Sequence, residues 1–130
     1  MAETLTEKTK NPASSRQAIL AFHFADRIKS EIHLASSLLA SVAQLQGQER
    51  EGASRLFLEF LQGLEMEINL ASAQINEPEM VRVSTVMRGL KGMADASMFE
   101  EMQSHFTWMI TVMATFAHRA MEYLIREKLL

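Results

Sequence analysis

The residues of this chain best suited to chemistry are its histidines and the carboxylates close to them. The four histidines are His23, His33, His105 and His118. Glu101 precedes His105 by four residues, and Glu122 follows His118 by four, so each pair lies on one face of a helix. Such pairs could hold a divalent metal, or could act as acid and base in a hydrolytic enzyme.

The spacing of these residues does not favour a metal centre. Di-iron helical bundles use a Glu-x-x-His motif, which this chain lacks. His105 and His118 are thirteen residues apart, which places them on nearly opposite sides of one helix. The chain has no cysteine, and this excludes disulfides, thiolate zinc sites and a cysteine nucleophile. We therefore expect no metal and no cofactor, and we keep a metal-dependent or hydrolytic enzyme using His105, His118 and carboxylates as an alternative.

One short segment resembles a known phosphotransfer motif. The segment Met87-Arg88-Gly89-Leu90-Lys91-Gly92 is similar to the motif of histidine phosphotransfer domains, four-helix bundles in which a histidine precedes x-Leu-Lys-Gly. Arg88 stands where those domains have the phosphorylated histidine, so the resemblance does not imply phosphotransfer. It implies at most a non-phosphorylatable relative, and the relation of the Leu90-Lys91-Gly92 segment to these domains stays open.

Composition and charge favour a soluble cytoplasmic protein. The net charge is −3 and the pI is about 5.8, so nothing in the balance attracts nucleic acid or an acidic membrane surface. The longest strongly apolar run, residues 106–117, is shorter than the ~20 residues that a membrane-spanning helix needs. We expect no contact with nucleic acid and none with a membrane.

Apolar periodicity predicts four helices and no strand. The expected helices cover residues 12–46, 49–76, 78–90 and 98–128. Asn11 and Pro12 are typical of a helix start, and Gly47 is typical of a helix end. Gly89 and Gly92 predict the turn after the third helix. Ser97 with Glu100 three residues later predicts a capping box that opens the fourth helix.

The predicted fold is all-α, an elongated antiparallel four-helix bundle with three long helices and one short helix. Residues 1–11 are expected to form a disordered tail, and residues 12–130 a single helical domain. A 32-residue helix is roughly 48 Å long, whereas a compact chain of this size is only about 36 Å across. The short third helix also leaves one side of the bundle partly uncovered. A twofold homodimer is the simplest way to complete it.

The fourth predicted helix is apolar around most of its circumference. One strip follows the four-three repeat of coiled-coil packing and predicts a dimer interface formed by Met102, Phe106, Met109, Met113, Phe116, Ala120 and Tyr123. Since a second apolar strip lies beside it, the helix could pack inside its own bundle and across an interface together.

These patterns favour a non-enzymatic interaction or regulatory protein that acts through protein–protein contacts, as a homodimer and with a protein partner that the sequence does not identify. A bundle that binds a small apolar ligand is the second interpretation. Eight of the ten methionines lie between Met80 and Met121, and Met is a flexible side chain that suits adaptable pockets. In that interpretation the pocket would include Trp108, with Thr111 and His118 as polar groups.

Overall fold

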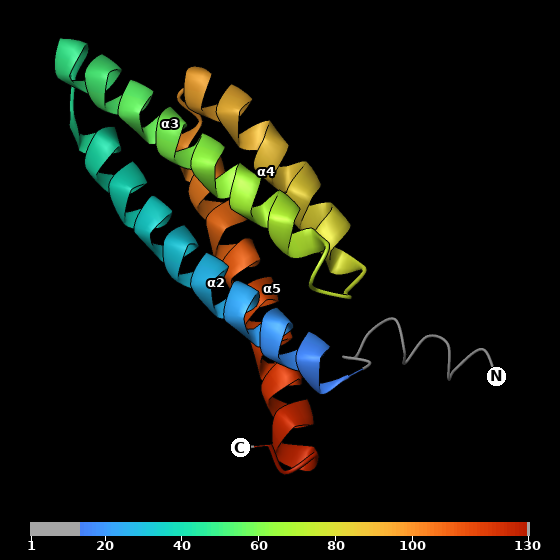
Figure 1. Ribbon diagram of the computed structural model, residues 1–130. Coiled ribbons are helices and arrows are strands. Elements are labelled where there is room, and N and C mark those ends of the chain that lie inside the picture. The colour runs from blue at the N-terminus through green and yellow to red at the C-terminus, as the bar shows by residue number, and fades with distance from the viewer. Residues whose placement is uncertain (1–13, 130) are drawn as a thin grey trace.

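The computed structural model describes residues 14–129, and the regular secondary structure in this part of the chain is four helices and no strand (Figure 1). The helices are α2 (Ser15–Gln44), α3 (Gly47–Ser72), α4 (Glu79–Asp95) and α5 (Phe99–Arg126). The predicted all-helical class is therefore confirmed for the described residues. The tail predicted for residues 1–11 lies outside them. No helix among the described residues has the length and apolar character needed to cross a bilayer.

Consecutive helices run in opposite directions and surround one core (Figure 1). Helix α2 packs against α3 and α5, and α4 also packs against α3 and α5, so each helix has two neighbours. The contact between α2 and α5 is the most extensive of the four. The first and last described helices thus lie side by side, although they are the most distant in sequence.

Each helix contributes one apolar face to the core. Phe57 of α3 and Phe106 of α5 meet edge to face at its centre, with ring centroids 6.5 Å apart. The largest side chains with almost no exposure are Phe106, Ile28, Ile32, Leu39, Leu61, Leu64, Ile68, Met87, Leu90, Met102, Met109 and Met113. No polar or charged residue is buried in the part of the chain that the structure describes, so hydrophobic burial holds the helices together.

Helix α2 begins at Ser15, and the start predicted at Asn11 and Pro12 lies outside the described residues. Ser14 is the N-cap, and its hydroxyl oxygen accepts a hydrogen bond from the Gln17 amide at 3.1 Å. The helix ends at Gln44, and the chain turns into α3 at Gly47, which has a φ of 59°. Glycine adopts this left-handed conformation without a steric cost, which explains the turn expected at this residue.

The connection between α4 and α5 differs from both predictions made for it. Helix α4 continues through Gly89 and Gly92 to Asp95, so these glycines lie inside the helix and not in a turn. The predicted capping box is also wrong, because the N-cap of α5 is Met98 and no side chain caps it. Ser97 has a φ of 56°, and the Met98 amide donates to the Met93 carbonyl at 2.8 Å. Ser97 therefore ends α4 in a Schellman motif and does not cap α5.

Polar contacts join α5 to two segments that are distant from it in sequence. Gln103 of α5 donates from its side-chain amide to the Ser36 carbonyl of α2 at 2.8 Å, and the Ser36 hydroxyl donates to the Gln103 side-chain oxygen. Arg119 of α5 contacts Glu77, in the connection between α3 and α4, at 2.6 Å. These contacts set the position of α5 along its neighbours.

Candidate interaction surface on helices α2 and α3

The residues predicted to form a dimer interface lie mostly inside the chain's own core. Six of them are at most 2% exposed, namely Met102, Phe106, Met109, Met113, Phe116 and Ala120. Tyr123 is half-buried, with the Arg126 guanidinium 5.5 Å from its ring centroid. Because the other helices already cover the six buried side chains, a second copy could reach them only if the core opened. A dimer that leaves this core intact would use another surface.

The three residues predicted to line a ligand pocket lie on α5, with Trp108 half-buried and Thr111 and His118 exposed. The ring of Trp108 lies 5.3 Å from the Arg82 guanidinium. The Thr111 hydroxyl donates to the Thr107 carbonyl at 3.1 Å, within its own helix. His118 is exposed and pairs with Glu122 at 3.0 Å. None of these three residues is among the lining residues of the α2–α3 hollow or of the hollow at the connection between α3 and α4, both described below.

The four histidines lie at different places on the surface, and none of them is buried. His23, His33 and His118 are exposed, and His105 is half-buried. Among residues 14–129, no group of three histidine, aspartate or glutamate side chains is placed to hold a metal ion. The pair of His118 and Glu122 is therefore an exposed contact along one helix, of the kind expected at this spacing.

An apolar hollow lies between α2 and α3 near the connection that joins them. We call it the α2–α3 groove; its lining residues are Leu38, Ser41, Val42, Leu45, Ala53, Leu56, Phe57 and Phe60. Its volume is about 390 Å³, and Ser41 is its single polar lining residue. At its rim, Leu56 is 70% exposed and Leu38 is 37% exposed. The groove thus presents apolar side chains to solvent as a connected surface.

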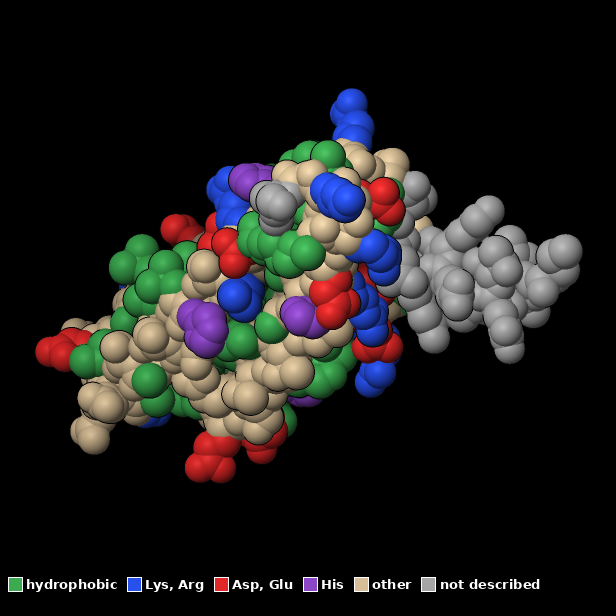
Figure 2. All heavy atoms as spheres, turned by 90° about the horizontal axis from the view of Figure 1, so that it is seen from below, with side chains coloured by type: hydrophobic (Ala, Val, Ile, Leu, Met, Phe, Trp, Pro, Cys, Tyr) green, Lys and Arg blue, Asp and Glu red, His purple; other side chains and the backbone are tan. Residues whose placement is uncertain are grey.

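Seen from below, the molecule shows charged side chains of both signs interspersed with apolar ones (Figure 2). The α2–α3 groove is defined by its lining residues and by the exposure of Leu38 and Leu56. Isolated exposed apolar residues are normal on protein surfaces, but connected apolar patches mark contact sites.

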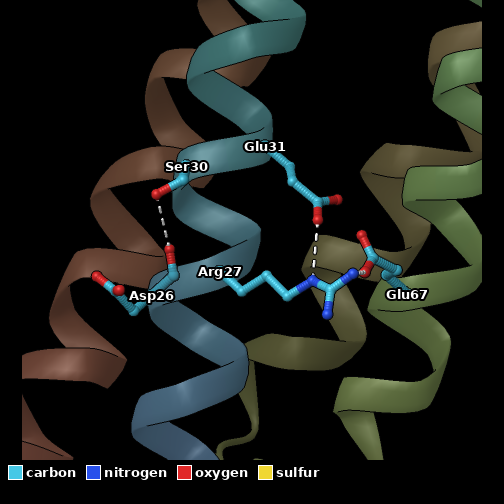
Figure 3. Close-up of polar contacts among 5 residues, drawn as sticks. All are labelled: Asp26, Arg27, Ser30, Glu31 and Glu67. Carbon is cyan, nitrogen blue, oxygen red and sulfur yellow. Dashed lines mark hydrogen bonds and ion pairs between the residues drawn. The ribbon is translucent and has the colours of Figure 1, made fainter.

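Helices α2 and α3 are also joined by a charged cluster formed by Arg27, Glu31 and Glu67 (Figure 3). Arg27 donates from Nε to Glu31 at 3.1 Å, and its terminal nitrogen lies 2.7 Å from Glu67 of α3. In the close-up Arg27 points across toward α3, whereas Asp26 points to the other side of α2. The arginine therefore bridges two carboxylates on neighbouring helices.

The electrostatics of this cluster favour a neutral Glu67. Partial burial, followed by the hydrogen bond and negative charge of Glu31, raises the pKa of Glu67 to about 7. Arg27 acts in the opposite direction and only partly offsets these effects. A carboxyl that titrates near neutral pH could transfer protons, but the arginine is engaged by both carboxylates. We interpret the cluster as a bridge that holds α2 beside α3.

A second, more polar hollow lies at the connection between α3 and α4. It has a volume of about 520 Å³, and Asn69, Ser72, Ser84 and Arg88 are among its lining residues. Arg88, which stands at the histidine position of the phosphotransfer-like segment, is exposed at this hollow. The hollow is wide and its lining is mixed, so it does not select one kind of ligand.

The groove was not predicted as a site, although the sequence carries a signal for it. Leu38 and Leu45 extend the apolar face of α2 beyond the residues that follow a strict four-three repeat. On α3, Leu56 and Phe57 are adjacent, and only Phe57 enters the core. A helix whose apolar residues extend beyond one face is expected to pack against a further surface in addition to its own core.

The chain has no significant match among protein-family models, curated proteins or solved structures. The class of protein is therefore defined by its own features, four helices around an apolar core with an exposed apolar groove between two of them.

Proposed function

We propose that this chain is a non-enzymatic helical interaction protein that acts through protein–protein contacts in the cytoplasm, as a homodimer. The observation that carries the proposal is the α2–α3 groove, with its apolar lining and its exposed rim residues Leu38 and Leu56. In this proposal the fold is an elongated antiparallel bundle whose uncovered α2–α3 side is completed by a second molecule.

The groove has the properties of a surface that receives apolar side chains from a helix. Amphipathic helices place an apolar face in such grooves, and a few buried apolar anchors supply most of the binding energy. At Leu56, 70% of the residue surface is in contact with water in the single chain. Covering it would gain hydrophobic free energy that the fold by itself does not gain.

A small apolar ligand is the second candidate, and the same groove favours it. Its volume of about 390 Å³ falls in the range of small-molecule sites. The lining consists of leucine, valine, alanine and phenylalanine with one serine, in place of the methionines that were expected to form such a pocket.

Native mass spectrometry of the purified chain separates these two functions. A dimer without added mass is the expected result, and a retained small molecule on a monomer would favour the ligand-binding alternative. Leu38→Glu should weaken the dimer, because it places a charge at the groove rim. Thr111→Glu, on the exposed face of α5, is the matched control and should leave the dimer intact. A monomer without ligand at every concentration would contradict both candidates.

A further inference from the structure

The outward face of α3 carries a regular stripe that the fold leaves uncovered. Its residues follow steps of four and three, the spacing of a coiled-coil seam, and we call it the α3 stripe: Gly52, Leu56, Glu59, Gly63, Met66, Leu70 and Ala73. Leu56, Met66 and Leu70 are 70%, 64% and 66% exposed. Only Glu59 carries a charge. The cores of protein–protein interfaces have the same composition, with few charged residues and several large apolar ones.

The corresponding face of α5 shows how different the α3 stripe is. The exposed residues along α5 include Ser104, Thr107, Thr111 and Thr115. The threonine hydroxyls donate to carbonyl groups of α5 itself, so this face is polar and already satisfied. The apolar repeat on α5 faces inward, whereas α3 has an inward apolar face and the outward stripe as well.

The size pattern of the α3 stripe is the same from either end. Counted outward from Gly63, each side has a long side chain, then a leucine, then a small residue: Glu59, Leu56 and Gly52 on one side, and Met66, Leu70 and Ala73 on the other. A surface that meets its own copy about a twofold axis must be complementary to itself. A palindromic stripe meets this condition when the two helices run antiparallel.

We propose that α3 of a second copy packs antiparallel along the α3 stripe, with the twofold axis at Gly63. This inference rests on the proposed homodimer and names its surface and register. Leu56 then lies against Leu70 of the second copy, and Leu70 against its Leu56. Because Leu56 also lines the α2–α3 groove, Leu70 of the second copy sits at the groove rim.

Gly63 allows the two helices to approach closely at the axis. It is exposed in the middle of a helix, where glycine is less stable than alanine. A Cβ added there would meet no atom of the same chain within 4 Å, so the fold of one chain does not require glycine at this position. Two helices that meet at paired glycines can lie at the short end of the usual 8–10 Å range of interaxial distances.

Charge is compatible with this arrangement. Each Glu59 lies four residues from the axis, so the two Glu59 positions are about 12 Å apart along the helices. In this register each Glu59 is level with Glu67 of the other copy and one residue away from its Met66. Glu67 lies beside the stripe and is already paired with Arg27 at 2.7 Å. No two carboxylates of the stripe are forced into contact.

The length of the stripe suits a stable dimer. From Gly52 to Ala73 it extends for about 32 Å of helix. A standard interface buries about 800 Å² on each partner, which is about a tenth of the 7996 Å² that the described chain exposes. The stripe together with the neighbouring groove rim provides a continuous surface for this contact.

Cysteine cross-linking tests the axis and the direction, because the natural chain has no cysteine. Gly63→Cys should form a disulfide-linked dimer under mild oxidation, and Thr111→Cys, on the polar face of α5, should not. Leu56→Cys and Leu70→Cys should each stay unlinked alone, because in the antiparallel pair each lies about 21 Å from its own copy. Mixed together, these two variants should link, since disulfides require Cα atoms within about 7 Å.

The outcomes separate this inference from the proposed function. If native mass spectrometry shows a dimer but neither Gly63→Cys nor the mixture of Leu56→Cys and Leu70→Cys links, the α3 stripe is not the interface, although the homodimer stands. If Leu56→Cys links to itself, a parallel pair replaces the antiparallel one. A chain that is monomeric at all concentrations overturns both proposals.

A charge variant gives a second test that does not depend on oxidation. Met66→Glu should weaken dimerisation at least tenfold in sedimentation equilibrium, with an unchanged helical circular dichroism spectrum because Met66 is exposed in the single chain. Gln62→Glu, on the same helix beside the stripe, is the matched control. Equal dimerisation of both variants would contradict the inference.

Discussion

At the scale of single residues, the most informative side chain is Glu67. Its carboxylate pairs with the Arg27 guanidinium at 2.7 Å and lies close to Glu31. The pKa of Glu67 is raised to about 7 from the usual 4.5. The folded chain therefore holds a proton that the unfolded chain has already released between these two pH values. Stability linked to this group is fully present below about pH 4.5 and is lost as the pH rises toward 7.

Glu67→Gln should remove this pH dependence. Glutamine stays neutral, so the variant should be more stable than the natural chain above pH 7, by about 1 kcal/mol after allowance for screening by solvent. Near pH 4 the two chains should be equally stable. Urea unfolding at several pH values measures the difference, with the exposed Glu51→Gln on the same helix as control. A constant difference at all pH values would contradict the assignment.

Phe106 gives a second residue-scale prediction. Its side chain is fully buried and meets Phe57 at the centre of the core. Phe106→Ala should therefore lower the free energy of unfolding by about 3–5 kcal/mol, through lost burial and the cavity left behind. Ile125→Ala, at a position 58% exposed, should cost much less. Urea denaturation followed by circular dichroism compares the two, and similar losses would argue against the observed packing.

At the scale of helices, the sequence predicts the number of helices and the absence of strands that the described residues show. It misplaces ends that depend on backbone conformation, since Ser97 looks like a cap but takes a left-handed φ of 56° and ends α4 instead. It also assigns the Met102 to Ala120 repeat to a dimer interface, because periodicity alone does not tell an interior face from an external one. The groove depends on α2 and α3 meeting side by side, which no local pattern contains.

The two glycines inside α4 lead to a prediction at this scale. Gly89 and Gly92 are exposed within the helix, and an added Cβ would meet no atom within 4 Å at either position. Gly89→Ala should therefore raise the free energy of unfolding by about 0.5–1 kcal/mol, because alanine loses less backbone entropy. Thermal unfolding measures the gain. A loss of stability would mean that α4 does not pass through this residue as a regular helix.

At the scale of the whole molecule, a homodimer should make stability depend on concentration. Association favours the folded state by mass action. A tenfold increase in protein concentration should raise the midpoint of thermal unfolding by about 2–4 °C. Met66→Glu should show a smaller rise, because it weakens the association and leaves the single chain folded. A midpoint independent of concentration in the natural chain would contradict the dimer.

The reciprocal pair of Ser36 and Gln103 joins residues that are 67 positions apart in the chain. During synthesis α2 leaves the ribosome long before α5. The apolar face of α2 that carries Ile28 and Ile32 therefore stays exposed until α5, its most extensive packing partner, is made. Closing such a distant contact is slow compared with forming a helix. Helix α5 therefore completes this core, and a nascent chain that stops before Phe99 would expose the apolar surface that chaperones recognise.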